Sequence, residues 1–182
     1  MKFERTALPE VILCKPKLFA DARGYFMESF RQDLLDAFLG ESIHFCQDND
    51  AKSNRGVLRG LHYQIAPKSQ TKLVRVIKGA VLDVVVDLRK ESENFGKHIV
   101  VELNETNKYQ LFIPKGFAHG YITLKDDTIF TYKVDAYYSN ECERGIRYND
   151  AELNIDWQSD GMDLIISEKD LRQPSFSEAT YF

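Results

Sequence analysis

Residues 55–64 read RGVLRGLHYQ, and this stretch decides how the rest of the chain is interpreted. Two glycines and two arginines surround His62. Glycine lets a backbone turn sharply or approach a ligand closely, and arginine presents a planar set of donors that suits phosphate. Histidine suits proton transfer near neutral pH, so the group suggests a phosphorylated substrate beside a base. A strand and turn with a hydrogen-bonded histidine would look the same, and the stretch alone favours this plainer interpretation because short motifs often match by chance.

A second stretch changes that balance. Residues 112–121 read FIPKGFAHGY and contain Pro114, Gly116 and His119 in the order Pro-x-Gly-x-x-His. The two stretches together resemble the paired motifs of the cupin superfamily. The resemblance implies an all-β fold, a cupin-like double-stranded β-helix (jelly-roll barrel) with a few short peripheral helices, in a single domain over residues 1–182.

The chain departs from the cupin pattern at two positions that matter for a metal. Gln64 stands where the second histidine ligand of the motif is expected, and Lys72 stands where its glutamate ligand is expected. A catalytic metal usually has about three protein ligands, and a cation such as Lys72 opposes metal binding. We therefore expect a cupin-like barrel without a functional metal. A positive group at the centre of the barrel suits the stabilisation of an anion that forms there.

The composition is that of a globular protein. The 182 residues, 43% of them hydrophobic, suffice for one core. A formal net charge of -4 leaves no excess of cations for nucleic-acid phosphates, so we expect no nucleic-acid partner. No apolar run is long enough for a membrane span, and no signal peptide is recognisable. The three cysteines are odd in number, lie far apart and form no Cys-x-x-Cys, which favours the reducing cytoplasm.

Most of the chain outside the two motifs shows strand patterns. They cover residues 10–16, 71–88 with a turn near Lys78-Gly79, 98–103, 109–113 and 128–138. The tetrapeptide Asn104-Glu105-Thr106-Asn107 predicts a hairpin between the strands on its two sides. Many short strands favour a sandwich or a barrel.

Two strand segments carry polar side chains that have both a structural and a functional interpretation. Gln47 and Asn49 alternate, so they share a face if residues 45–50 form a strand instead of a turn. Tyr132 shares a face with Phe130, where a core tyrosine with a satisfied hydroxyl would also lie.

Two helices are predicted. Ser29 and Gln32 match a capping box, Gly40 supplies a stop, and the apolar face between them would pack on the exterior of the domain. Ser167 and Asp170 match a capping box for a short terminal helix, which by itself is the simplest explanation of Asp170.

One combination of motifs makes the resemblance more specific. Residues 55–62, Lys72, residues 114–119, Tyr132, residues 137–138 and residues 167–170 occur in one order that resembles the dTDP-4-dehydrorhamnose 3,5-epimerase family over nearly the whole chain. The resemblance implies a cofactor-independent enzyme of deoxysugar biosynthesis that works as a homodimer on a dTDP-linked nucleotide-sugar substrate.

The resemblance assigns four catalytic residues. His62 would remove the protons at C3 and C5, which are acidic because both carbons neighbour the C4 ketone. Asp170 would orient the imidazole and stabilise its charge, as in a catalytic dyad. Lys72 would lie near the enolate oxygen, and Tyr132 would return a proton from the opposite face of the ring.

The resemblance also assigns ten substrate-binding residues. Arg59 and Arg23 would contact the pyrophosphate, His119 the sugar, and Tyr138 would stack on the base, which any base tolerates. The remaining positions that match the family's substrate contacts are Glu28, Gln47, Asp48, Asn49, Glu143 and Lys169. A surface position explains Glu143 and Asp48 equally well.

Other functions stay open at this point. A sister enzyme would epimerise a nucleotide-linked 4-ketosugar at C3 or C5 alone, and a 3,4-ketoisomerase is a more distant alternative. A non-catalytic cupin would only bind the sugar nucleotide, although His62, Lys72, Tyr132 and Asp170 together argue against it. Gln64 and Lys72 argue against a metal-dependent dioxygenase.

Overall fold

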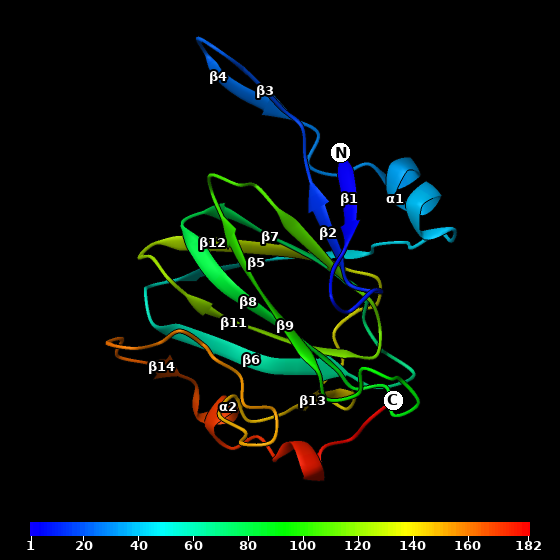
Figure 1. Cartoon of the computed structure of the whole chain (residues 1–182), viewed down its shortest axis with the longest axis vertical. Helices are drawn as coiled ribbons and strands as arrows, with labels where there is room; N and C mark the ends of the chain where they lie inside the picture. The colour runs from blue at the N-terminus through cyan, green and yellow to red at the C-terminus, as the bar shows by residue number, and fades with distance from the viewer.

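Two antiparallel sheets form the body of the protein (Figure 1). The computed structural model describes residues 1–182. The first sheet, in the order β1-β2-β10-β7-β12-β5, consists of β1 (Lys2–Arg5), β2 (Ile12–Lys15), β10 (Gln110–Ile113), β7 (Lys72–Lys78), β12 (Thr128–Val134) and β5 (Gln47–Ser53). The second, in the order β13-β6-β11-β8-β9, consists of β13 (Glu143–Gly145), β6 (Val57–Gln64), β11 (Phe117–Thr123), β8 (Ala80–Asp87) and β9 (His98–Asn104). The predicted all-β jelly-roll barrel is confirmed.

The core lies between the two sheets, and β8 explains why its sequence is almost continuously apolar. Val81 and Val85 on β8 pack into the central core with Val74 and Phe130 of the first sheet. The alternate residues of β8 point the other way, into a second core that the C-terminal segment covers with Trp157 and other apolar side chains. Every residue of β8 is therefore buried. The C-terminal segment includes β14 (Ile165–Ile166), which runs parallel to β6, α2 (Glu168–Leu171) and the 3-10 helix Phe176–Glu178.

The helix α1 (Gln32–Leu39) packs on the outer face of the first sheet, as predicted. Gly40 ends it with a left-handed backbone (φ 78°), which confirms the predicted stop. The predicted capping box at Ser29 is wrong. The helix begins one residue after Arg31, and the Gln32 side chain donates instead to Asp36 and to the Ile43 carbonyl. Neither helix has the length and hydrophobicity that a membrane span requires.

The predicted hairpin at residues 104–107 is also wrong, although both of its strands exist. β9 pairs with β8, whereas β10 pairs with β2 and β7 in the other sheet. The turn itself forms, because the Asn104 side chain accepts hydrogen bonds from the amides of Thr106 and Asn107. The segment is therefore a corner where the chain passes from one sheet to the other.

One hairpin stands away from the barrel (Figure 1). It consists of β3 (Leu18–Asp21) and β4 (Gly24–Met27), with the turn predicted near Asp21 to Gly24. Its apolar side chains are exposed: 50% for Phe19, 55% for Tyr25 and 65% for Phe26. Exposed aromatic surface of this extent is typical of contact surfaces.

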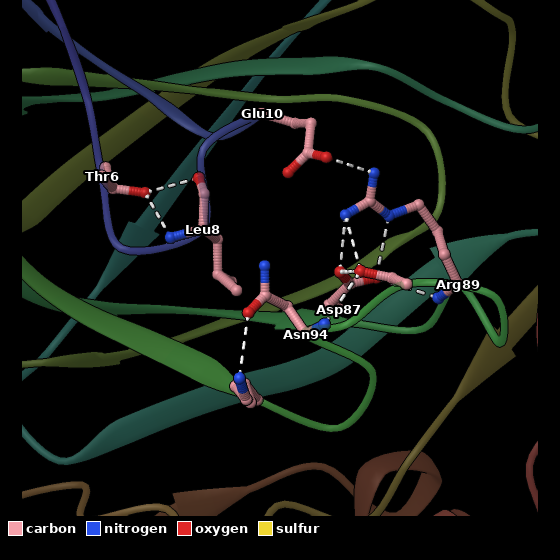
Figure 2. A network of polar contacts seen from close by, with 8 residues as sticks. Thr6, Leu8, Glu10, Asp87, Arg89 and Asn94 are labelled. Carbon is pink, nitrogen blue, oxygen red and sulfur yellow. Dashed lines mark hydrogen bonds and ion pairs between the residues drawn. The ribbon is translucent and has the colours of Figure 1, made fainter.

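A partly buried ion network ties the N-terminal segment to the end of β8 (Figure 2). The Arg89 guanidinium donates to Glu10 at 2.8 Å and to Asp87 at 2.6 Å. Ser92 donates to the same Asp87 carboxylate at 2.7 Å. Asp87 is completely buried, so its charge is tolerated because these groups satisfy it.

Candidate active site

A cavity of about 720 Å³ opens inside the barrel. Its wall combines β6 and β11 of the second sheet with β5, β7 and β12 of the first, and the C-terminal segment closes one side. Ten of the predicted site residues line it: His62, Lys72, Tyr132, Asp170, Asn49, Arg59, His119, Tyr138, Glu143 and Lys169.

His62 and Asp170 form an imidazole–carboxylate pair. His62 Nε2 lies 2.5 Å from Asp170 Oδ1, across 108 residues of sequence. Ser167 caps α2 by accepting a hydrogen bond from the Asp170 amide at 3.1 Å, as the sequence predicts. The Asp170 carboxylate serves the dyad, and it also accepts a hydrogen bond from the Gly60 amide. Burial works to raise the pKa of Asp170, but its hydrogen bond and charge interaction with His62 hold that pKa below the ordinary value.

Two glycines let the motif strands approach closely enough to build the site. Gly60 on β6 has a φ of 124°, and a Cβ atom there would lie 2.5 Å from the Cα of Gly120 on β11. A Cβ at Gly120 would in turn lie 2.8 Å from the Arg59 carbonyl oxygen. No larger residue fits either position without moving a backbone. The two strands then bring His62 and His119 opposite each other in the register.

His119 has a carboxylate partner that the sequence analysis missed. Its Nε2 lies 2.9 Å from Oδ2 of Asp83, a residue with no exposed surface. Burial lowers the pKa of His119 and raises that of Asp83. The sequence does contain a signal that these two aspartates have partners, because Asp83 and Asp87 are the only charged residues in the apolar run 81–88. Asp87 is explained by Arg89, and Asp83 is explained by His119.

Lys72 is a buried cation close to both histidines. Its ammonium group makes one hydrogen bond, to the His62 carbonyl oxygen at 3.3 Å. Burial lowers the pKa of Lys72 to about 8, against the opposing charges of Asp83 and Glu143. A buried ammonium group with so few acceptors is well suited to an incoming anion.

Aromatic side chains line the cavity from both sheets. Tyr132 on β12 and His62 on β6 line the cavity from different sheets. Burial raises the pKa of Tyr132. Tyr121, two residues after His119 on β11, stacks on Phe130 at 4.2 Å between ring centroids. Its hydroxyl is buried without a hydrogen-bond partner, and the period-2 spacing from His119 is the signal that would have placed it in the cavity.

The outer part of the cavity carries ionic and aromatic groups. Arg59 is anchored by two hydrogen bonds from its guanidinium to the Ser53 hydroxyl oxygen, at 3.3 and 3.2 Å. Tyr138 donates to Glu143 at 2.8 Å, and Lys169 donates to the same carboxylate at 2.5 Å. Burial would raise the pKa of Glu143, but these two donors hold it below the ordinary value. Glu143 is therefore an ionised acceptor that joins Tyr138 and Lys169.

Four predicted binding residues do not line the cavity. Arg23 lies at the tip of the exposed hairpin and pairs with Asp21, and Glu28 pairs with Arg31. Gln47 and Asp48 are consecutive residues of β5, so their side chains point to opposite faces of the sheet. Asp48 pairs with Lys133 on the outer face, and Gln47 donates to Asn49 beside the cavity. Within one chain the structure leaves Arg23, Glu28 and Asp48 away from the dyad.

The cupin metal-ligand positions hold side chains that do other work. The Gln64 amide is 3% exposed and bonds to backbone groups of Lys68, Tyr137 and Ser139. Lys72 occupies the position of the glutamate ligand. No group of three His, Cys, Asp or Glu side chains in the structure is arranged to hold a metal.

Comparison with known proteins shows the family. The model of the dTDP-4-dehydrorhamnose 3,5-epimerase family matches residues 5–178. The dTDP-4-dehydrorhamnose 3,5-epimerase of Shigella flexneri is 47% identical over 182 residues, which cover 100% of this chain and 99% of that protein.

Two solved structures have the same fold. The enzyme of the same name from Bacillus anthracis, with TDP and pyrophosphate bound, superposes with a TM-score of 0.91 at 44% identity, covering 96% of this chain and 99% of the other. The dTDP-6-deoxy-D-glucose-3,5-epimerase of Legionella pneumophila, in complex with dTDP-4-keto-L-rhamnose, gives 0.91 at 41% identity, covering 97% and 93%. The chain therefore belongs to the dTDP-4-dehydrorhamnose 3,5-epimerase family, which consists of isomerases.

Proposed function

We propose that the chain epimerises dTDP-4-dehydro-6-deoxy-D-glucose at C3 and C5 to give dTDP-4-dehydro-L-rhamnose, in dTDP-rhamnose biosynthesis, with the His62–Asp170 dyad as the base. The observation that carries the proposal is this dyad, which lines one wall of a cavity whose other wall holds Tyr132. Full-length relatives with this activity, and the ligands bound to two of them, support the substrate.

The chemistry assigns one task to each catalytic residue. His62 takes the proton from a carbon beside the C4 ketone, and Asp170 stabilises the imidazolium that forms. The electron pair moves onto the ketone oxygen, where the Lys72 ammonium group stabilises the enolate. Tyr132 returns a proton from the opposite face, which inverts the carbon. Because protons move and no net oxidation occurs, the proposed steps need no cofactor and no metal.

The neighbouring residues suit the rest of the substrate. His119, held by Asp83, would hydrogen-bond the sugar, and Arg59 would meet the pyrophosphate. Tyr138 would stack on the base, with Lys169 and Glu143 at its edge. Asn49, which accepts a hydrogen bond from Gln47, would contact the nucleotide from β5.

A homodimer would account for the residues that lie away from the dyad. The β3–β4 hairpin stands away from the barrel, and its aromatic side chains are exposed (Figure 1). If it docks on a second copy, Arg23 at its tip and Glu28 at its base approach the partner's cavity. The substrate site would then be completed by two chains. The enzyme would work in the cytoplasm, which suits its three free cysteines.

Proton NMR in D₂O tests the proposal directly. Purified protein without added metal is incubated with dTDP-4-keto-6-deoxyglucose, and a coupled reductase reports formation of dTDP-L-rhamnose. Deuterium at both C3 and C5 together with dTDP-L-rhamnose is expected. Label at one carbon would replace the proposal with a single-site epimerase, and no label would point to a different sugar nucleotide or to a binding protein.

A further inference from the structure

The loop that carries Tyr138 lacks the backbone hydrogen bonds that would fix it. After Val134 the strand β12 ends, and Asp135 still bonds through its amide to the Thr71 carbonyl. The next three residues, Ala136 to Tyr138, make no backbone–backbone hydrogen bond. Unpaired backbone groups normally mark a segment with several accessible conformations.

Three glutamine side chains supply the missing bonds. Gln70 donates to the Ala136 carbonyl at 2.8 Å. Gln64 donates to the Tyr137 carbonyl at 3.4 Å and accepts from the Ser139 amide at 2.7 Å. Gln47 accepts from the Tyr138 amide at 3.4 Å. Four consecutive residues are thus each held by a glutamine, and we call Gln47, Gln64 and Gln70 the glutamine clasp.

Gln64 is the central member of the clasp. It is 3% exposed, and its amide group also donates to the Lys68 carbonyl at 2.6 Å. The glutamine amide offers two N–H donors beside a carbonyl acceptor, which an ionised carboxylate or an apolar side chain of similar size lacks. Its three hydrogen bonds tie the 65–68 turn to the Tyr138 loop.

The clasp fixes the backbone of Tyr138, whose side chain is in turn oriented by a hydrogen bond to Glu143. The Tyr138 side chain is half exposed, and its hydroxyl donates to Glu143 at 2.8 Å. A ring can stack on a base with full effect only if its backbone is already ordered, because otherwise binding must pay the ordering entropy. We infer that the glutamine clasp preorganises Tyr138, and that Gln64 and Gln70 are positioning residues that set the affinity for the nucleoside part of the substrate. This inference rests on the proposed contact of Tyr138 with the base.

Two ligands separate this role from a general effect on the cavity. dTDP has a base and inorganic pyrophosphate has none. For Gln64→Met we expect the dissociation constant of dTDP, measured by calorimetry, to rise roughly tenfold, within the range that loss of base stacking produces. The inhibition constant of pyrophosphate should stay within about twofold of wild type, because the clasp makes no hydrogen bond to Arg59 and distant sites couple weakly. Gln70→Met, which removes one hydrogen bond instead of three, should give a smaller rise in the same direction.

Matched variants complete the test. Gln32 on α1 also donates to a backbone carbonyl, that of Ile43 at 2.8 Å, so Gln32→Met controls for the chemistry of the substitution and should leave dTDP binding unchanged. In a Tyr138→Ala background, Gln64→Met should weaken dTDP binding no further. At saturating substrate the turnover of Gln64→Met should match wild type while KM rises.

Each other outcome has a definite meaning. Unchanged dTDP binding in both Gln64→Met and Gln70→Met would overturn the inference. So would equal weakening of dTDP and pyrophosphate, or a full effect of Gln64→Met in the Tyr138→Ala background. If Tyr138→Ala itself bound dTDP like wild type, the proposed role of Tyr138 would fail first. Should Gln64→Met not fold, Gln70→Met carries the same comparison.

Discussion

His62 on β6 and His119 on β11 are direct cross-strand partners, and each is bound to a different carboxylate. The His62 side chain is 30% exposed and pairs with Asp170, whereas the His119 side chain is 8% exposed and pairs with Asp83. Burial lowers the pKa of His119, which favours the neutral form of that ring. The two motif histidines therefore differ in exposure and in partner, which fits the proposed roles of His62 as the base and of His119 as a hydrogen-bonding group.

Substituting each histidine in turn should reveal this difference. His62→Ala is expected to lower turnover by about 10²–10⁴-fold, the usual contribution of a general base, and to abolish deuterium exchange at C3 and C5. His119→Ala should raise KM and slow both exchanges while leaving them detectable. Proton NMR in D₂O measures both variants, and full activity of His62→Ala would refute the mechanism.

Lys72 should set the alkaline limit of activity. Because burial lowers its pKa to about 8, the free enzyme loses the Lys72 charge above that pH. We expect kcat/KM to fall about tenfold per pH unit above roughly pH 8. Lys72→Met should nearly abolish turnover at every pH. A wild-type kcat/KM that stays constant above pH 8 would contradict this role of Lys72.

The same substitution should stabilise the fold. The pKa of Lys72 lies below its unfolded value, so the protonated side chain costs folding free energy below about pH 8, and the cost fades as pH rises to 10.5. A shift of this size corresponds to roughly 3 kcal/mol. Thermal unfolding of Lys72→Met at pH 7 should give a higher Tm than wild type, with the gap closing near pH 10. A lower Tm at pH 7 would mean that the attraction of the Lys72 charge to Asp83 and Glu143 outweighs the cost of burying that charge.

Tyr132→Phe should uncouple proton removal from inversion. The base on the opposite wall is intact in this variant, so deuterium exchange should continue at C3 and C5. Formation of the inverted product, followed with a coupled reductase, should fall by about 10²-fold or more because the acid is missing. Epimerisation at the wild-type rate would exclude Tyr132 as the acid.

Tyr121→Phe is expected to weaken binding without weakening the fold. The Tyr121 hydroxyl is buried and has no partner in the free protein, so its removal should leave the Tm equal or higher. If the hydroxyl donates to the substrate near Arg59, KM should rise by roughly tenfold, as expected for one buried hydrogen bond. Unchanged KM would place the substrate away from Tyr121.

Mixing two inactive variants should restore activity if the hairpin completes the partner's site. Arg23→Ala lacks a hairpin residue, and His62→Ala lacks the base. A mixed dimer contains one cavity with both groups intact and one cavity with neither group. Random pairing makes about half of the dimers mixed, and each mixed dimer has one working site of two. Co-refolded protein should therefore recover up to about a quarter of the wild-type rate. Separate preparations combined without subunit exchange serve as the control. No recovery despite a demonstrated mixed dimer would assign Arg23 to its own chain or to no site.

The sequence by itself determined the local structure and the chemical inventory. Alternating and continuous apolar runs predicted β7, β8 and β12, because burial on one or both faces of a strand requires them. Gly40 and Ser167 marked helix ends, because their backbone and side chain satisfy terminal groups locally. The order of the motifs identified His62, Lys72 and Tyr132 as candidate catalytic residues, because these residue types suit proton transfer and the stabilisation of an enolate.

Only the tertiary structure decided which of these groups meet. Asp170 reads as a helix cap in the sequence, and 108 residues separate it from the histidine that it holds. Asp83 reads as an interruption of a core strand, and residues 104–107 read as a hairpin although their strands belong to different sheets. Local patterns encode hydrogen bonding and burial within a few residues, whereas such partnerships depend on the order in which strands pair across the whole barrel. That order is a property of the assembled core, so the dyads and the glutamine clasp appear only once the chain has folded.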